Sequence, residues 1–336
     1  MKQADLDFTM IICAYNPEAR ILQRCLQAVR QLDVRGLTAE VILVDNNSTA
    51  PLRTLPYVKA AMEQAPGMQV LLVREQGLSH ARIAAIACAR GRHIVFFDDD
   101  NAPETGYLQG LQALIAAYPE VAAWGPGRVT VDFIDGISPA IMDFARGIFQ
   151  QRQETEVRFA RLPDWQSCYP YGTGLCIRAD LLHQYAALAA AGRLTQSGRK
   201  GGQLSSGEDL QMVLLCIREG FAAGVAPALR LTHIIPGSRA NRRYLERLIY
   251  GTYGSYEPSL LQVFPEKRPA VEKQLLPAPV FVRTAIRLWL RAKCSRRPQK
   301  TFDLIGYIAR EGGRYKAVGK PLLALVRHMA ASLQVR

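Results

Sequence analysis

The fold is decided by the stretch HIVFFDDDN at residues 93–101, where an apolar run ends in three consecutive aspartates. A short apolar run with polar boundaries is typical of a buried strand. Asp98, Asp99 and Asp100 then follow at the carboxyl end of that strand. On both sides of this stretch, the chain repeats the pattern of an apolar run that ends in polar residues.

Three further strands are predicted before this stretch, with helices between them. The helix at 18–31 is indicated by apolar residues at helical spacing, and a second helix is expected at 78–91, closed by Gly91. Strands that alternate with helices indicate an α/β fold with a mostly parallel sheet, whose ligands bind at the carboxyl ends of the strands. The three strands are FTMIIC at 8–13, EVILVD at 40–45 and MQVLLVRE at 68–75.

The middle of the chain continues as mixed α/β structure. The segment 195–207 is rich in Gly, Ser and Gln and is expected to be a mobile loop. Beyond residue 236 the pattern becomes helical. The predicted elements of the middle are a strand at 121–133, a strand and helix at 171–182, a helix at 207–221 and a strand at 225–236.

Positive charge is concentrated in the last hundred residues. The 336-residue chain has a formal net charge of +13, and residues 237–336 hold 20 Lys and Arg against 6 Asp and Glu, a net of +14. Residues 1–236 hold 22 basic and 23 acidic side chains. With 49% hydrophobic and 21% charged residues, the chain is neither a disordered polyelectrolyte nor a membrane-embedded protein. The basic segment favours an anionic partner, either nucleic acid or lipid headgroups.

The segment VFVRTAIRLWLRAKCSRR at 280–297 predicts a basic amphipathic helix. Two interpretations stay open for it: attachment to an anionic membrane surface, or packing on the rest of the protein with a solvated basic face. No recognised DNA- or RNA-binding module occurs, so a nucleic-acid partner is not expected.

The cysteine pattern and the N-terminus bear on location. Seven cysteines are an odd number, and none forms a CxxC pair or a zinc-type cluster, which favours a reducing compartment. The first residues lack the apolar core of a signal peptide, and no run approaches the roughly 20 apolar residues of a spanning helix. A cytoplasmic location is expected, with peripheral attachment at the inner membrane face if the basic helix binds lipid.

The three aspartates are the first candidate functional residues. Adjacent carboxylates raise each other's pKa, so such a cluster is costly unless a cation compensates it. Hard oxygen ligands suit Mg²⁺ or Mn²⁺. The alternative is a solvated acidic turn or a helix cap. Because side chains alternate along a strand, Asp98 and Asp100 are expected to share a face, with Asp99 turned away.

Four other polar residues are candidates, each with a structural alternative. Asp45 ends a strand and either accepts hydrogen bonds from a base or ribose or caps the next turn. Glu208 and Asp209 start a helix and either complement its dipole or supply a general base. His233 taken alone is more typical of a structural residue than of a ligand. The chain has no GxGxxG after the first strand and no GxxxxGK[ST], which counts against a dinucleotide dehydrogenase and a P-loop NTPase.

Taken in order, these motifs resemble the family-2 glycosyltransferases with the GT-A fold, and in particular bacterial enzymes of exopolysaccharide assembly. The resemblance covers roughly residues 8–253. It rests on IICAYN (11–16), VILVDNNST (41–49), REQGLSHARIAAI (74–86), FFDDDN (96–101), GTGLCIRADLL (172–182), GEDLQMVLLCIREGF (207–221) and LTHIIPGSR (231–239).

The resemblance implies a role for each matched residue. Asp209 would be the catalytic base and Glu208 would orient the acceptor or support the adjoining loop. Asp100 and His233 would bind Mn²⁺ or Mg²⁺. The third acid, Asp99, departs from the family pattern, which often has a neutral residue there, so the division of ligands among the three aspartates stays open. The donor-binding residues implied are Ala14, Tyr15 and Asn16 beside the nucleotide, Asp45 at the base, Arg82 at the base or pyrophosphate, Asp98 at ribose or metal-bound water, and Asp99.

The resemblance further implies a metal-dependent, inverting glycosyltransferase. Its donor would be a nucleotide-diphosphate sugar, a UDP-sugar in particular, and its acceptor a glycan or lipid-linked oligosaccharide in polysaccharide biosynthesis. Residues 1–236 would form the catalytic domain, with a Rossmann-like sheet, nucleotide-sugar binding in 1–120 and the acceptor side in 121–236. Residues 237–336 would form a basic helical extension. The alternative is a non-catalytic GT-A-like protein that binds carbohydrate or assembles a synthase.

Overall fold

The computed structural model describes residues 5–65, 67–195, 204 and 207–335. The chain divides into two compact units. Unit 1 comprises Met1–Asp132, Gln150–Arg193 and Met212–Ile234, and unit 2 comprises Phe133–Phe149, Leu194–Gln211 and Ile235–Arg336. The loop expected at 195–207 lies almost wholly outside the described residues. The domain boundary after residue 236 stays a prediction.

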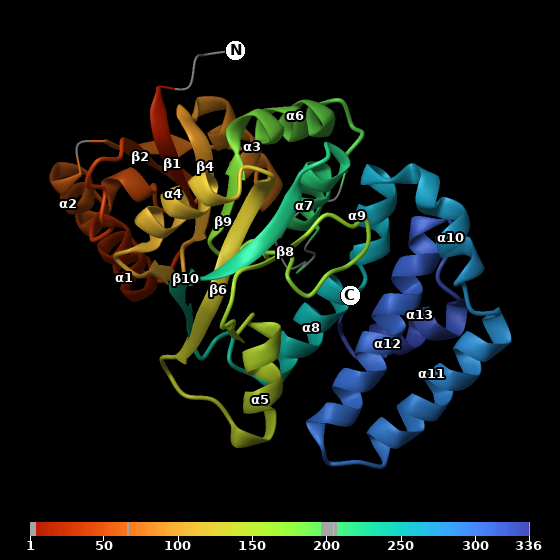
Figure 1. The fold of residues 1–336 in the computed structure, drawn as a ribbon. Coiled ribbons are helices and arrows are strands. Elements are labelled where there is room, and N and C mark those ends of the chain that lie inside the picture. Colours follow the sequence, from red (N-terminus) through yellow and green to blue (C-terminus); the bar gives the residue numbers. More distant parts are fainter. Residues whose placement is uncertain (1–4, 66, 196–203, 205–206, 336) are drawn as a thin grey trace. The chain divides into compact units, whose positions relative to one another are not determined.

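Unit 1 is built on a central sheet with helices on both faces (Figure 1). Within the described residues, the strand order is β3-β2-β1-β4-β9-β6-β10-β5, with β7 beside β6 and β8 beside β10. The strands are β1 (Leu6–Ala14), β2 (Ala39–Asp45), β3 (Met68–Leu72), β4 (Gly91–Asp98), β5 (Asn101–Pro103), β6 (Val121–Phe133), β7 (Arg152–Gln153), β8 (Arg158–Ala160), β9 (Leu175–Arg178) and β10 (Ala222–Ile235). The helices that run with them are α1 (Ala19–Arg30), α2 (Pro56–Gln64), α3 (Leu78–Cys88), α4 (Tyr107–Ala117), α6 (Ala179–Ala190) and α7 (Glu208–Arg218).

The first four strands pair in parallel, which confirms the α/β class predicted from the sequence. Ile11 of β1 pairs with Ile42 of β2 and with Phe96 of β4, and β2 pairs in parallel with β3. Beyond β4 the direction changes, because β9 runs antiparallel to both β4 and β6.

Successive side chains of each strand point to opposite faces of the sheet and so into two separate layers. Phe8, Met10 and Ile12 of β1 point into a buried cluster that includes Leu22 of α1 and Leu108 of α4. The intervening side chains face the layer of α3 and α6. Both faces are therefore covered, as the continuous apolar runs of these strands require.

Among the predicted boundaries in unit 1, the end of the second helix and the end of the third strand are wrong. Helix α3 ends at Cys88, and Gly91 starts β4 instead of closing the helix. A Cβ on Gly91 would lie 2.3 Å from the backbone nitrogen of Thr9, so the glycine permits the close approach of two strands. Strand β3 ends at Leu72, before the predicted residue 75, because the following segment turns to contact the end of β2.

Unit 2 is helical, as expected for the C-terminal region, and it also includes α5 from the middle of the chain. Helix α12 packs against α5, α8, α9, α11 and α13. The rings of Phe144 in α5 and Phe302 in α12 stack at 4.5 Å between centroids. The helices are α5 (Pro139–Ile148), α8 (Arg242–Tyr253), α9 (Tyr256–Val263), α10 (Arg268–Lys273), α11 (Ala278–Lys293), α12 (Pro298–Ala317) and α13 (Ala324–Ser332).

Two sequence-based inferences about membranes and thiols can be compared with the structure. In the part of the chain that is described, no helix combines the length and the apolar character needed to cross a bilayer. All seven cysteines are free thiols.

Candidate functional site

The candidate residues of the first half of the chain meet at one edge of the sheet. Ala14 of β1 pairs with Asp45 of β2, and Cys13 of β1 pairs with Asp98 of β4. Parallel strands end at the same edge, so β1, β2 and β4 deliver these residues side by side. This is the edge at which α/β sheets bind ligands.

The loop after β1 is fixed to the loop after β2. The backbone N–H of Asn16 donates to Ser48 Oγ at 3.0 Å, and Asn16 Oδ1 accepts from the backbone N–H of Thr49 at 2.8 Å. Asn16 has a positive φ of 45°, a conformation that asparagine tolerates better than most residues. The preceding Tyr15 is exposed. The loop therefore presents a rigid backbone with an exposed aromatic ring.

Asp45 is buried and caps the turn that follows β2. Its Oδ1 accepts from the backbone N–H of Ser48 at 2.9 Å, and its Oδ2 accepts from that of Leu52 at 2.8 Å. The capping role that the sequence left open is thus present in the structure. A contact from Asp45 to a nucleotide base stays a prediction.

Asn46 is a positioning residue that the sequence reasoning did not single out. Its Nδ2 donates to the carbonyl of Glu75 at 2.8 Å, and its Oδ1 accepts from the backbone N–H of Gly77 at 2.7 Å. These bonds tie the end of β2 to the start of α3. The sequence signal for Asn46 was that a second polar residue directly follows the strand. Its hydrogen-bond partners lie about thirty residues away and have no local sequence signature.

Arg82 of α3 is buried against the end of β4. Its Nη2 lies 3.3 Å from Asp98 Oδ1, and its guanidinium stacks over the ring of Phe96 at 5.1 Å. A buried arginine in this position is neutralised by the carboxylate and held by the ring. The structure thus brings together two of the residues that the resemblance assigns to the donor.

The acidic cluster turns away from the strand after its first residue. Strand β4 ends at Asp98, and Asp99 and Asp100 form a turn before β5. Asn101 shapes this turn, because its Oδ1 accepts from the backbone N–H of Asp98 at 3.1 Å and its Nδ2 donates to Asp100 Oδ1 at 2.7 Å. Strand alternation therefore does not set the directions of Asp99 and Asp100, contrary to the expectation that Asp98 and Asp100 share a strand face.

Asp100 and His233 lie together, although 133 positions separate them in the sequence. The pairing of β5 with β10 sets Asn101 opposite His233. Both side chains are buried, and His233 Nε2 lies 3.4 Å from Asp100 Oδ2. The backbone N–H of Ile234 also donates to the carbonyl of Asp100 at 2.8 Å, which fixes the turn.

The donor set of this pair suits a divalent cation. A carboxylate oxygen and an imidazole nitrogen are ligands that Mn²⁺ accepts, and Mg²⁺ sites often use one or two carboxylates together with substrate phosphates. Within the described residues, no group of three or more His, Cys, Asp and Glu side chains is arranged to hold a metal by itself. The pair therefore fits a cation whose remaining ligands come from a diphosphate and water.

The negative charge of the cluster acts on its neighbours. Burial raises the pKa of the Cys25 thiol well above its usual value, and the charges of Asp99, Asp100 and Asp98 raise it further. The protonated thiol donates to the carbonyl of Asp98 at 3.5 Å. Burial, and then the charge of Asp99, also raises the pKa of Tyr57.

Glu208 and Asp209 stand at the start of α7, in the part of that helix that belongs to unit 2. Glu208 is buried and its Oε2 accepts from the backbone N–H of Gly207 at 3.2 Å. Asp209 is partly exposed and its Oδ1 accepts from the backbone N–H of Leu210 at 2.9 Å. Both carboxylates therefore lie at the positive end of the helix dipole, where a negative charge is stabilising.

Exposed aromatic side chains precede β9, whereas Trp124 and Tyr169 are buried in the core. Trp165 is 56% exposed and Tyr171 is 40% exposed. The guanidinium of Arg152 stacks over the ring of Tyr171 at 5.0 Å. Because β9 starts at Leu175, opposite Phe96, and runs antiparallel to β4, the chain just before it lies at the carboxyl end of β4.

Gly174 fixes the position of the chain just before β9. It has a positive φ of 68°, and a Cβ there would lie 2.6 Å from the hydroxyl of Tyr107. That hydroxyl donates to the carbonyl of Gly174 at 2.6 Å. A glycine is therefore required at the last position before β9.

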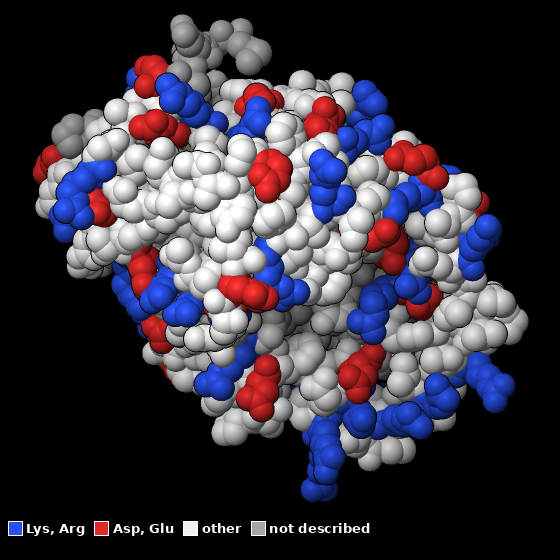
Figure 2. All heavy atoms as spheres, viewed as in Figure 1, with Lys and Arg blue, Asp and Glu red and all other residues white. Residues whose placement is uncertain are grey.

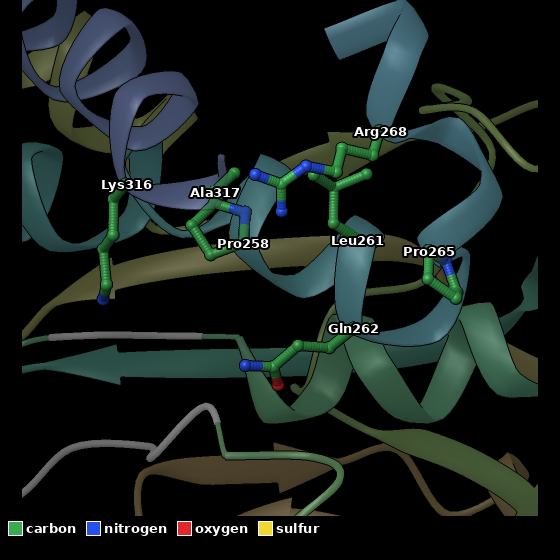
Figure 3. A pocket seen from close by; sticks show the side chains of 7 residues that line it. All are labelled: Pro258, Leu261, Gln262, Pro265, Arg268, Lys316 and Ala317. Carbon is green, nitrogen blue, oxygen red and sulfur yellow. The ribbon is translucent and has the colours of Figure 1, made fainter. Parts of the chain in front are cut away.

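A small hollow of about 210 Å³ lies in unit 2 (Figure 3). Pro258, Leu261 and Pro265 line it together with Arg268 and Lys316. The guanidinium of Arg268 already donates to the carbonyl of Val318 at 2.8 Å. None of the predicted site residues lines this hollow, so it has no part in the candidate site.

Comparisons with known proteins agree with this picture. The model of the glycosyl transferase family 2 matches residues 9–182. The succinoglycan biosynthesis protein ExoO of Rhizobium meliloti (strain 1021) is 30% identical over 157 residues, which is 47% of this chain and 39% of that protein. The chain thus spans about two fifths of the length of this relative.

A solved structure of a mannosyltransferase shares the fold. The mannosyltransferase PcManGT from Pyrobaculum calidifontis, in complex with GDP-Man and Mn²⁺, has a TM-score of 0.50 and 18% identity over 94% of this chain and 89% of that chain. S. aureus TarS in complex with UDP-GlcNAc has a TM-score of 0.46 and 14% identity over 93% and 92% of the two chains. At these identities the first likeness shows the GT-A-type fold alone, and the second adds no further argument.

Proposed function

Because the chain belongs to glycosyl transferase family 2, we propose that it transfers a sugar from a nucleotide-diphosphate sugar to a hydroxyl acceptor with inversion at the anomeric carbon. The observation that carries the proposal is the buried pair of Asp100 and His233, 3.4 Å apart, at the sheet edge that also holds Asp98 and Arg82. A buried acid and histidine at a ligand-binding edge are typical of a site that holds a charged substrate.

The donor side of the site would be held by residues of unit 1. Asp100 and His233 would bind Mn²⁺ or Mg²⁺, and a bound cation offsets the negative charge that develops on a diphosphate leaving group. Asp98, with Arg82 behind it, would contact ribose. Our proposal for the donor is a UDP-sugar, and the GDP-mannose named for the Pyrobaculum enzyme is the alternative to test beside it.

Asp209 would act as the general base and Glu208 would orient the acceptor. In the proposed step, the acceptor oxygen attacks the anomeric carbon from the face opposite the diphosphate, and its proton moves to the carboxylate of Asp209. The bond from the anomeric carbon to the diphosphate oxygen breaks, and its electron pair leaves with the diphosphate. The place of Asp209 in the first turn of α7, where the helix dipole favours a carboxylate, supports this role.

The proposed acceptor is a glycan or a lipid-linked oligosaccharide in bacterial polysaccharide biosynthesis. The name of the Rhizobium relative supports this class of pathway. The exposed rings of Trp165 and Tyr171 offer flat apolar surfaces of the kind that pack on sugar rings. The proposal assigns catalysis to residues 1–236 and peripheral attachment at the cytoplasmic membrane face to residues 237–336.

The test compares two aspartates that both lie in the first turn of a helix, Asp209 in α7 and Asp180 in α6. Asp209→Asn should lower sugar transfer from UDP-sugars to a bacterial membrane extract by about 10²–10⁴-fold, because the general base is lost. Metal-dependent binding of nucleoside diphosphate, measured by calorimetry, should be kept.

Asp180→Asn is the control and should change neither quantity, because Asp180 pairs with Arg178 outside the proposed site. Undiminished transfer by Asp209→Asn would contradict the assignment of the base. An equal loss in both variants would point to a general effect of removing a carboxylate.

A further inference from the structure

Helix α11 has one face packed and one face exposed. Phe281 and Ala285 are buried, and the ring of Phe281 lies 5.6 Å from the rings of both Tyr307 and Tyr315 in α12. At about 100° per residue, six exposed side chains fall within an arc of about 140° on the opposite side of the helix. This outer face of α11 consists of Val280, Arg283, Ile286, Arg287, Leu290 and Arg291.

The outer face of α11 combines apolar and basic side chains. Val280, Ile286 and Leu290 are 46%, 37% and 52% exposed. The sequence from 273 to 302 holds eight Lys and Arg and no Asp or Glu. Figure 2 shows Lys and Arg side chains in a row along its lower right edge, where Figure 1 has α11. Single exposed aliphatic side chains are ordinary, but three on one face between arginines form an amphipathic surface.

We propose that the outer face of α11 docks on an anionic lipid surface. The three aliphatic side chains would enter the boundary between headgroups and acyl chains, and the arginines would stay at the level of the phosphates. The helix has 16 residues, or about 24 Å, and lies along the surface of the bilayer. Trp289, with Lys293 5.5 Å from its ring, flanks this face with the kind of aromatic residue found at membrane interfaces.

This inference deepens the peripheral attachment included in the proposed function and names the surface that makes it. Vesicle binding does not require sugar transfer, so the two proposals fail separately. A nucleic acid is the other anionic partner, but phosphate contacts would leave the three aliphatic side chains without a role.

The experiment measures co-sedimentation of the full-length protein with two kinds of vesicle, phosphatidylcholine alone and phosphatidylcholine mixed with phosphatidylglycerol. The protein should bind the mixed vesicles and not the neutral ones, and salt should weaken the binding because the basic residues contribute electrostatically. A short DNA duplex, offered separately, serves as the competing probe.

Two variants of the outer face of α11 are matched by two controls elsewhere. The triple variant R283Q/R287Q/R291Q should reduce the partition onto mixed vesicles by about a hundredfold, at about fivefold per charge. Its control R30Q/R53Q/K59Q removes the same net charge from exposed positions of unit 1 and should keep vesicle binding.

The double variant I286Q/L290Q should reduce the partition about tenfold or more, because two apolar side chains lose their burial in lipid. Its control L72Q/L162Q changes two leucines that are 53% and 54% exposed in unit 1, and it should bind as the original protein does. Circular dichroism of all four variants verifies that they are folded.

Three results would overturn the proposal. The first is the absence of binding to the mixed vesicles. The second is an equal loss in a variant and its control, which would make the attraction a property of net charge. The third is binding of the DNA duplex through the outer face of α11 without vesicle binding, which would assign this face to nucleic acid.

Discussion

The two ends of the central sheet both hold acidic side chains, but their surroundings differ. At the amino end, the buried Glu40 of β2 accepts from Thr9 Oγ1 at 2.7 Å and from the backbone N–H of Arg90 at 2.8 Å. Its other oxygen accepts from Arg90 Nε at 3.0 Å. At the carboxyl end, three successive aspartates lie beside Arg82 and His233.

The difference separates a structural carboxylate from a candidate functional cluster. Glu40 is neutralised within the protein by donors from the neighbouring strands, so its charge serves only to join them. The aspartate cluster instead extends its field to Cys25 and Tyr57, whose pKa values it helps to raise. Excess negative charge at a ligand-binding edge is suited to a cation that arrives with the substrate.

The largest expected effect would come from removing the carboxylate of Asp100. Asp100→Ala should abolish metal-dependent binding of nucleoside diphosphate and lower turnover by about a thousandfold, since a bound cation contributes several kcal/mol to stabilising the leaving group. Calorimetry with Mn²⁺ and a sugar-transfer assay measure the two effects.

Asp132→Ala is the matched control for Asp100→Ala. Asp132 forms a surface ion pair with Arg24 at 2.9 Å, so its removal takes away one carboxylate of unit 1 outside the cluster. Nucleotide binding by this variant should be normal. If Asp100→Ala bound nucleotide with Mn²⁺ as tightly as the original protein, the assignment of Asp100 to the metal would be wrong.

At the opposite end of the sheet, Glu40→Gln should lower stability and not turnover. The amide presents two N–H groups where Arg90 Nε needs an acceptor, so the free energy of unfolding should fall by about 1–3 kcal/mol. Turnover per folded molecule should stay unchanged. Urea unfolding followed by circular dichroism measures the first quantity.

Asp143→Asn provides a comparison for Glu40→Gln, because the ion pair of Asp143 with Arg146 is solvent-exposed at 3.9 Å and surface pairs contribute little. Its unfolding curve should match that of the original protein. A Glu40→Gln variant that kept full stability but lost turnover would reverse the roles given to the two ends of the sheet.

The smallest effect is expected at Tyr171, whose exposed ring is proposed to contact the acceptor. Tyr171→Ala should raise the KM for the acceptor about fivefold, equivalent to the loss of one aromatic contact, and leave the KM for the donor unchanged. Tyr171→Phe should retain the original values because the ring is kept. A higher KM for the donor in Tyr171→Ala would move this residue to the other side of the site.

Sequence patterns predicted most of unit 1 because its strands are continuous apolar runs that end in polar residues. They failed where a residue acts through distant contacts. Gly91 looks like a helix end along the chain, but its role is to let β4 approach Thr9. The grouping of residues 133–149 with the C-terminal helices rests on packing such as that of Phe144 on Phe302, which has no local pattern.

In the candidate site, too, the sequence did not predict contacts between residues that are distant along the chain. The matched motifs identified Asp98, Asp100 and His233, yet only the pairing of β5 with β10 brings Asp100 to His233. The turn at Asp99 follows from the two side-chain hydrogen bonds of Asn101. The alternation of side chains along a strand does not take such bonds into account. Asn46 was missed for a related reason, because its partners are backbone groups of a distant segment.

The central claim is that the carboxyl end of the sheet holds a nucleoside diphosphate together with a divalent cation. The most direct measurement is the shift in thermal unfolding of the full-length protein with UDP and with GDP, each with and without Mn²⁺. A ligand that binds the folded state raises its apparent stability. The account predicts stabilisation by one of the two nucleotides that requires the metal. Stabilisation that is the same without Mn²⁺, or none with either nucleotide, would contradict it.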